Sequence, residues 1–389
     1  MFTEEKETVF ILGAGASWHY GYPTGERLVE KVIEKAELAM AYFVGSELEF
    51  DLPNYVRKLS SARNPAENWR LAQKTCEAIA FRLKEVNPLL IDYFLESNCD
   101  LQEIGKLLIA WVILECEAIH FKHPNVNRPG NESNVVSSRA DDWYRFVVHQ
   151  LMTGCASADS LVDNRVTFVT FNYDISLENA IHQRLSLTKF FADKPDCIKK
   201  FFRNERFLHV YGSVPNRLSP NDPVSKALIA SCENDHPERL DARTQATRVR
   251  FDNILNAAYA ASQSLLTIER TDKHDNVDIL ATAIRAIAQA KIIYILGYGF
   301  SEENSKRLKL HESLRLRALP LNKQKAIYFT NRDNHNRINK RASRLIFGTE
   351  HMFFPETGNE IHYLDNGSYV EKSTRDVYGA LSVDFDALD

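Results

Sequence analysis

The chain has 389 residues, of which 44% are hydrophobic, so it is long enough to bury one large core or two smaller ones. Its formal net charge of −4 argues against strong electrostatic attraction to nucleic acid or to an anionic membrane. The six cysteines include no pair at C-x-x-C spacing, which argues against a zinc ribbon or a disulfide scaffold and favours a reduced compartment.

Neither a signal peptide nor a membrane span is expected. Residues 1–7 are acidic and lack the apolar core of a signal peptide. The most apolar uncharged run, 107–114, is much shorter than the about twenty residues of a membrane span, so we interpret it as a buried helix. These features predict a cytoplasmic protein.

A short buried strand followed by a glycine loop is predicted near the start of the chain. The apolar residues 9–12 lead into Gly13, Ala14, Gly15 and Ser17. Glycines allow a tight turn and a close approach of backbone to ligand, and a helix start presents N–H groups to an anion. With a helix expected at about 26–35, the loop predicts a site for a dinucleotide pyrophosphate. Because Trp18 replaces the third glycine of the dinucleotide fingerprint, a strand-to-helix turn without a ligand is the alternative.

A long helical stretch follows. Residues 66–121 contain no strand pattern, and apolar residues recur there at helical spacing. Helices are predicted at 69–86, 88–96 and 101–115, before a polar loop at 122–140. We interpret 41–140 as an all-helical insertion.

The remainder of the chain alternates strands with helices. Buried strands are predicted at 165–171, 207–210, 291–296 and 325–330. Helices are expected at 143–151 and 276–290, and the polar segment 215–248 is interpreted as an exposed loop or lid. This alternation predicts an α/β fold, a Rossmann-like doubly wound parallel sheet formed by 1–40 and 141–389, with an inserted all-helical subdomain.

Four of the predicted strands end in glycine or polar residues. These endings are Gly13-Ala14-Gly15, Asn172-Tyr173-Asp174, Tyr211-Gly212-Ser213 and Gly297-Tyr298-Gly299. Ligands of such sheets bind at the carboxyl ends of the strands, so we expect the four endings to form one crevice.

Taken in order, these motifs resemble those of the sirtuin superfamily, and more narrowly those of the sirtuin-like NAD hydrolases of bacterial antiphage defence. The matching segments are 13–17 with Gly21-Tyr22-Pro23, then 170–174, 209–213 and 297–301. The resemblance covers the sheet domain, and no motif falls in the helical insertion.

Two departures from the family pattern bear on function. Sirtuin deacylases carry a four-cysteine zinc module that this chain lacks, so the resemblance implies hydrolysis of NAD rather than deacylation, with no metal. The family often has His-Gly after the third strand, whereas here Tyr211 precedes Gly212 and the nearby histidine is His209. Strand alternation predicts that His209 and Tyr211 share a face, which would let His209 reach the crevice.

The resemblance implies an NAD glycohydrolase that releases nicotinamide and ADP-ribose through an oxocarbenium-like state. Asn172 would orient water or ribose, and Asp174 would hold ribose hydroxyls and offset positive charge. His209, or otherwise Tyr211, would act as base or hydrogen-bond partner. The structural alternatives are an Asx turn for Asn172, a helix N-cap for Asp174 and a satisfied core side chain for His209.

The resemblance also implies a set of NAD-binding residues at the strand ends. These are Gly13, Ala14, Gly15, Ser17, Pro23, Thr24, Tyr211, Gly212, Gly297, Tyr298, Gly299 and Ser301. We expect Gly297 and Gly299 to approach the nucleotide by backbone, and Ser301 also to cap a helix. The basic residues within 332–344 are interpreted as a solvated helix face, with nucleic-acid contact as the lesser alternative.

Regulation is also expected by resemblance. Such hydrolases form homo-oligomers, and some act beside a HerA-type ATPase, so the helical insertion is our candidate for these contacts. The rival interpretation is a sensor or scaffold that binds NAD or ADP-ribose without hydrolysing it.

Overall fold

The computed structural model describes residues 2–3, 6–46, 65–122, 142–203, 205–214, 224, 226–228, 245–266, 277–314, 316, 324–348 and 360–385. Residue 122, the first of the polar loop expected at 122–140, ends a helix, whereas 123–140 and most of the polar segment 215–248 lie outside these residues.

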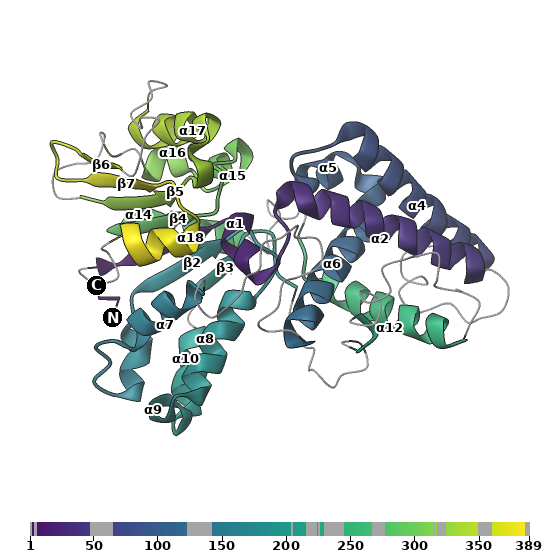
Figure 1. Ribbon diagram of the computed structural model, residues 1–389, viewed down its shortest axis with the longest axis horizontal. Coiled ribbons are helices and arrows are strands. Elements are labelled where there is room, and N and C mark those ends of the chain that lie inside the picture. Colours follow the sequence, from purple (N-terminus) through teal and green to yellow (C-terminus); the bar gives the residue numbers. More distant parts are fainter. Residues whose placement is uncertain are drawn as a thin grey trace.

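A seven-stranded sheet forms the centre of the fold (Figure 1). Its strands are β1 (Thr8–Leu12), β2 (Val166–Thr170), β3 (Phe207–His209), β4 (Ile292–Leu296), β5 (Ala326–Thr330), β6 (Glu360–Tyr363) and β7 (Tyr369–Ser373). The strand order is β3-β2-β1-β4-β5-β7-β6, and every neighbouring pair is parallel except β6 with β7. The expected α/β class is confirmed, and the mostly parallel sheet is consistent with a Rossmann-like fold.

Both faces of the sheet are buried. In β1, Val9 and Ile11 belong to one apolar cluster, whereas Phe10 and Leu12 belong to another on the opposite face. The second cluster contains residues of α7 (Tyr144–Met152), α8 (Ser176–Leu187), α9 (Lys189–Ala192), α10 (Pro195–Arg203) and α18 (Val377–Gly379). The first contains residues of α14 (Val277–Gln289), α16 (Leu310–Ser313) and α17 (Asn336–Phe347). Helices on both faces explain why the strands read as nearly continuous apolar runs.

A row of stacked aromatic rings crosses the sheet on one face. It consists of Phe207, Phe168, Phe10, Tyr294 and Tyr328, one from each of the strands β3, β2, β1, β4 and β5. Consecutive centroids are 4.9, 5.1, 4.8 and 4.9 Å apart, close to the spacing of neighbouring strands. These rings occupy paired positions, so their stacking favours one register across five strands.

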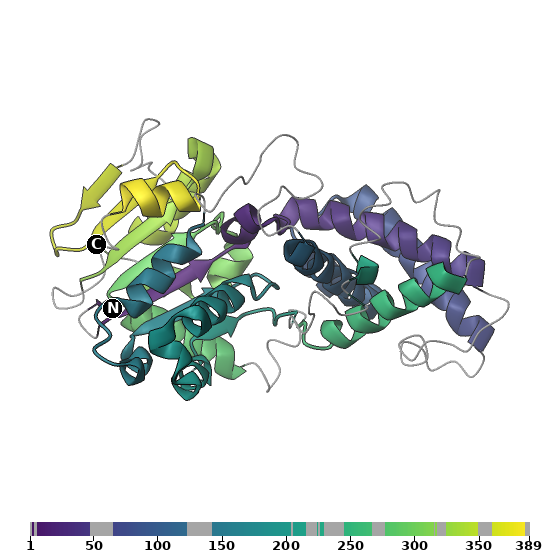
Figure 2. The same ribbon diagram turned by 60° about the horizontal axis from the view of Figure 1, so that its bottom comes forward.

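A cluster of helices lies beyond the carboxyl edge of the sheet (Figures 1 and 2). It comprises α2 (Gly25–Ser46), α4 (Pro65–Val86), α5 (Ile91–Ser97), α6 (Gln102–Lys122) and α12 (Gln245–Ser262). Residues 107–114 of α6 are buried, as the apolar run predicted. No helix in the described part of the chain is long and apolar enough to cross a membrane.

The helical cluster draws on more of the chain than the predicted insertion. Helix α2 extends well past the helix expected at 26–35, and α12, where no helix was predicted, packs against α6. A buried ion pair joins Lys35 Nζ to Glu115 Oε1 at 2.6 Å, between α2 and α6. The boundaries 41–140 of a separate inserted subdomain stay a prediction.

The turns after β1 and β4 touch backbone to backbone. A Cβ added to Gly13 would lie 2.4 Å from the Gly297 carbonyl oxygen, and one added to Gly297 would lie 2.2 Å from the Ala16 nitrogen. Gly297 also has a φ of +59°, in the left-handed region that favours glycine. Gly13 and Gly297 therefore permit close packing of the two strand ends.

This packing predicts different effects for two glycine substitutions. Gly297→Ala combines left-handed strain with a backbone clash and should lower the free energy of unfolding by about 4 kcal/mol. Gly299 has a φ of +65°, but a Cβ there would meet nothing within 4 Å, so Gly299→Ala should cost only about 1 kcal/mol. Urea unfolding of both variants measures the difference, and equal losses would contradict the packing role.

Candidate functional site

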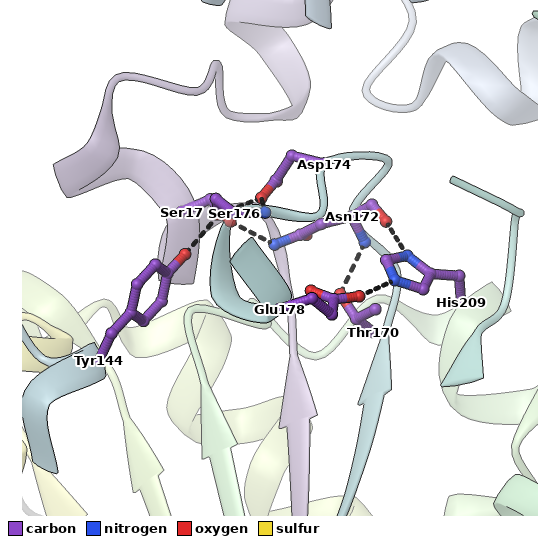
Figure 3. Close-up of polar contacts among 8 residues, drawn as sticks. All are labelled: Ser17, Tyr144, Thr170, Asn172, Asp174, Ser176, Glu178 and His209. Carbon is purple, nitrogen blue, oxygen red and sulfur yellow. Dashed lines mark hydrogen bonds and ion pairs between the residues drawn. The ribbon is translucent and has the colours of Figure 1, made fainter. Parts of the chain in front are cut away.

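The four predicted strand ends lie along the carboxyl edge of the sheet. β3, β2, β1 and β4 are consecutive parallel strands, so the residues that follow them lie along one edge. Figure 3 shows Ser17, Asn172, Asp174 and His209 gathered there. The structure therefore brings together the three predicted catalytic residues and one residue of the glycine loop.

The glycine loop differs from the expected anion site. The N–H of Gly13 donates to Leu296 O at 3.0 Å, that of Gly15 to Gly297 O at 3.0 Å, and that of Ala16 to Gly13 O at 2.9 Å. The helix that follows directly, α1 (Ala14–Ser17), has only four residues. The predicted anion site would use free N–H groups of this loop, but these three already have acceptors in β4, in the turn after β4 and in the loop itself.

Asn172 is fixed by contacts to the glycine loop. Its Nδ2 donates to Gly13 O at 3.1 Å and to Ser17 Oγ at 2.9 Å, and its backbone N–H donates to Thr170 Oγ1 at 3.0 Å. The side chain is buried, and its Oδ1 has no hydrogen-bond partner among the described residues. The Asx-turn alternative fails because the amide reaches residues remote in sequence and Oδ1 accepts nothing locally.

Asp174 is a buried carboxyl group at the start of α8. It accepts hydrogen bonds from the Ser176 N–H at 3.2 Å and from the Ser176 hydroxyl. Burial raises the pKa of Asp174 above its ordinary value, although hydrogen bonds from Ser176 and Ser17 oppose the shift. The capping alternative is partly correct, because the carboxylate satisfies one N–H of the first helical turn.

Both ring nitrogens of His209 are engaged. Nδ1 lies 3.0 Å from the Asn172 carbonyl oxygen, and Nε2 lies 2.5 Å from Glu178 Oε1 on α8 (Figure 3). Burial tends to lower the pKa of His209, but the charge of Glu178 and the hydrogen bonds outweigh it, so the pKa is raised. Neither nitrogen offers an open lone pair to a ligand in this arrangement.

Tyr211 occupies a different environment from His209. β3 ends at His209, and the Gly212 N–H donates to His209 O, which closes a turn. The Tyr211 hydroxyl donates to Asn304 Oδ1 on α15 (Glu302–Arg307), and its ring packs near that of Phe171. The alternation that was expected to align the two side chains therefore stops before Tyr211.

The remaining predicted NAD-binding residues have mixed surroundings. Tyr298 is buried, with its ring 5.2 Å from that of Phe171 and its hydroxyl 3.2 Å from Ser305 Oγ. Ser301 is the N-cap of α15, as predicted, and accepts from the Asn304 N–H. Gly212 forms an isolated bridge with Leu265.

Pro23 and Thr24 lie just before α2. Both are half-buried, and the Thr24 carbonyl accepts the N–H of Leu28 at 2.8 Å. Ala14 begins α1 and is half-buried, as is Gly299.

Three polar residues of the site were not predicted. Glu178 pairs with His209, Ser176 with Asp174, and the Tyr144 hydroxyl lies 2.5 Å from Ser176 Oγ. Ser176 and Glu178 stand in the first turn of α8, where polar and acidic residues are common, so their sequence positions carried no distinctive signal. Among the described residues, no cluster of His, Cys, Asp and Glu could hold a metal ion.

The environment of Asp174 predicts a pH-dependent cost to stability. Because burial raises its pKa, the folded state holds this proton more tightly, and stability falls as the pH rises through the folded pKa. Asp174→Asn removes that titration and should raise the free energy of unfolding at pH 7 by about 1 kcal/mol. Urea unfolding between pH 4 and pH 8 measures this gain, which should grow with pH. Asp193→Asn, at an exposed position, is the control and should change little.

Comparison with known proteins identifies no relative for this chain. No protein-family model, curated protein or solved structure matches it. What the site does must therefore be inferred from its geometry and from the motif resemblance described above.

Proposed function

We propose that the chain is an NAD glycohydrolase that cleaves NAD to nicotinamide and ADP-ribose. The observation that carries this proposal is the buried Asn172 side chain, whose Nδ2 is held by the glycine loop and whose Oδ1 has no partner among the described residues. Buried polar atoms nearly always have a hydrogen-bond partner, so an unpaired acceptor at the carboxyl edge of the sheet is best explained by a ligand.

The strand order supports a nucleotide as that ligand. β1 lies between β2 on one side and β4 on the other, so the chain changes direction across the sheet at β1. Open α/β sheets bind ligands outside the carboxyl ends of their strands at such a point. Gly13 and Gly297 mark this position, and Asn172 and Ser17 lie beside it.

The polar groups suit the chemistry of N-glycosidic cleavage. Nicotinamide leaves as a neutral group from a cationic ring, so the reaction needs a positioned water and stabilised positive charge rather than a strong acid. The Asn172 oxygen can accept a hydrogen bond from that water or from a ribose hydroxyl.

Asp174 is suited to stabilising the developing charge. It is buried, so an adjacent oxocarbenium would interact with its carboxylate more strongly than in water. Burial raises the pKa of Asp174, and an adjacent cation would oppose that shift and favour the ionised carboxylate. Removing Asp174 would therefore slow cleavage more than it weakens binding.

The biological setting is proposed from the motif resemblance. It suggests a cytoplasmic enzyme of abortive antiphage defence whose activity is controlled by homo-oligomerisation or by a HerA-type ATPase. The helical cluster supports a role in contacts, because α4 exposes the apolar side chains of Leu71 and Phe81. NADP is kept as an alternative substrate of the proposed enzyme.

A second candidate is a sensor that binds NAD or ADP-ribose without hydrolysing it. One observation favours it: both ring nitrogens of His209 are engaged, so the predicted base has no free nitrogen for catalysis. A site with few free catalytic groups is better suited to binding than to turnover. Measurement of product separates the two candidates.

The first test is nicotinamide release from NAD by the purified chain. Asn172→Ala removes the proposed acceptor and should lower kcat by about 100-fold, the scale typical of a lost positioning or stabilising group. Liquid chromatography of the reaction measures release. Asn336→Ala, at an exposed position that begins α17, is the matched control and should retain full activity.

Two results would count against hydrolysis. Full activity of a folded Asn172→Ala would remove the catalytic assignment. No release by the unaltered chain, alone or with a partner ATPase, combined with NAD binding detected by calorimetry, would favour the sensor.

A second test concerns assembly. Phe81 is 64% exposed on α4, and Phe81→Glu should dissociate an oligomer that uses this face, because a charge would be buried at the contact. Phe190→Glu, on α9 of the sheet domain, is the control. Multi-angle light scattering reports the mass of each, and an unchanged mass for Phe81→Glu would exclude this face as the contact.

A further inference from the structure

We propose that Glu178 and His209 form a positioning pair, in which a doubly protonated His209 holds the Asn172 carbonyl and so fixes the side chain that contacts the ligand. This role rests on the proposed function, but it makes His209 a group that acts through Asn172 rather than a base. It also gives a purpose to Glu178, which no sequence motif marked.

The hydrogen-bond geometry places a proton on Nδ1. This nitrogen lies 3.0 Å from the Asn172 carbonyl oxygen, and a carbonyl oxygen can only accept. Nδ1 must therefore be the donor. The contact joins the end of β3 to the loop after β2.

The same reasoning places a proton between Nε2 and Glu178. Nε2 lies 2.5 Å from Oε1, and an ionised carboxylate can only accept. The side chains of His209 and Glu178 are 10% and 17% exposed, so water does not compete strongly for either group. With acceptors facing both nitrogens, the imidazolium is the form that satisfies both contacts.

Charged groups around the ring support this form. Glu178 on α8 provides the main favourable charge, and Asp174, in the loop between β2 and α8, adds a smaller one. Together with the Asn172 carbonyl, they outweigh the burial that disfavours a charged ring.

The pair completes the restraint of Asn172. The backbone N–H of Asn172 donates to Thr170, its carbonyl accepts from His209, and its Nδ2 donates to Gly13 and Ser17. Every polar group of the residue except Oδ1 is thereby engaged. Loss of the His209 contact would free the carbonyl and misdirect Oδ1, and small displacements of a positioning group can lower rates by about 100-fold.

This arrangement has a distinctive pH dependence. When His209 loses a proton, the charge of Glu178 favours retention on Nε2, so Nδ1 is left facing the Asn172 carbonyl without a proton. Activity should therefore fall as the pH rises through the pKa of His209. A general base would give the opposite dependence, because it acts only when unprotonated.

Three variants test the proposal. His209→Ala removes the donor and should lower NAD hydrolysis by about 100-fold. His209→Asn places an amide nitrogen near the position of Nδ1, so it should hydrolyse NAD about tenfold faster than His209→Ala. If His209 were a general base, the asparagine would restore no activity. In Glu178→Gln, the amide donates to Nε2 and keeps the remaining proton of His209 on Nδ1. The loss of activity at high pH should therefore disappear.

The protonation state is measured without a substrate. In protein labelled with ¹⁵N-histidine, the signals that vanish in His209→Asn belong to His209 and should show both nitrogens protonated at pH 7. In protein labelled with ¹⁵N-asparagine, the side-chain amide signal that vanishes in Asn172→Ala belongs to Asn172. This signal should shift in His209→Ala and return toward its original position in His209→Asn. A neutral His209 ring at pH 7 would overturn the proposal. So would an Asn172 amide signal that is unchanged in both His209→Ala and His209→Asn.

The outcomes separate this inference from the proposed function. If the unaltered chain releases no nicotinamide, the hydrolase proposal fails, while the NMR signals and the ranking of NAD affinities by calorimetry still decide the positioning role. If NAD is hydrolysed but activity rises with pH through the His209 pKa, or His209→Asn is as inactive as His209→Ala, the positioning role fails and the hydrolase stands.

Discussion

The site depends on the backbone contact between the turns that follow β1 and β4. Gly13 and Gly297 approach so closely that neither position has room for a Cβ, and hydrogen bonds from Gly13 and Gly15 join the two turns. Asn172 then anchors its amide on the Gly13 carbonyl. The glycines are thus required first for the geometry of the strand ends, and any ligand contact is built upon that packing.

The stacked aromatic rings help to set the register that brings the last residues of neighbouring strands opposite one another. Their paired positions favour the register in which Leu12 lies opposite Thr170 on one side and Leu296 on the other, with His209 opposite Thr170. A slip by one residue would turn each ring to the other face of the sheet, so the register is strongly specified. Apolar packing within the sheet therefore determines which polar residues become neighbours at its carboxyl edge.

Pairing of polar groups separates the site residues into two kinds. His209 and Ser176 have their hydrogen-bonding groups directed at other protein groups, whereas Asn172 keeps one buried acceptor without a partner among the described residues. Satisfied groups confer rigidity, and an unsatisfied one indicates where a ligand contributes the missing contact. This distinction cannot be made from residue type, because histidine, asparagine and aspartate are equally plausible site residues in the sequence.

Local patterns in the sequence were sufficient to predict the strands β1 to β5, the buried helix α6 and the helix cap at Ser301. They also predicted that Asn172, Asp174 and His209 lie at strand ends. Such features follow from the periodicity of apolar residues and the hydrogen-bonding habits of residues near helix ends. The tertiary structure decided that α12 packs on α6, that Glu178 pairs with His209 and that the loop N–H groups have acceptors. Each of these depends on a partner distant along the chain, and a donor in the sequence does not reveal which acceptor the fold will place beside it.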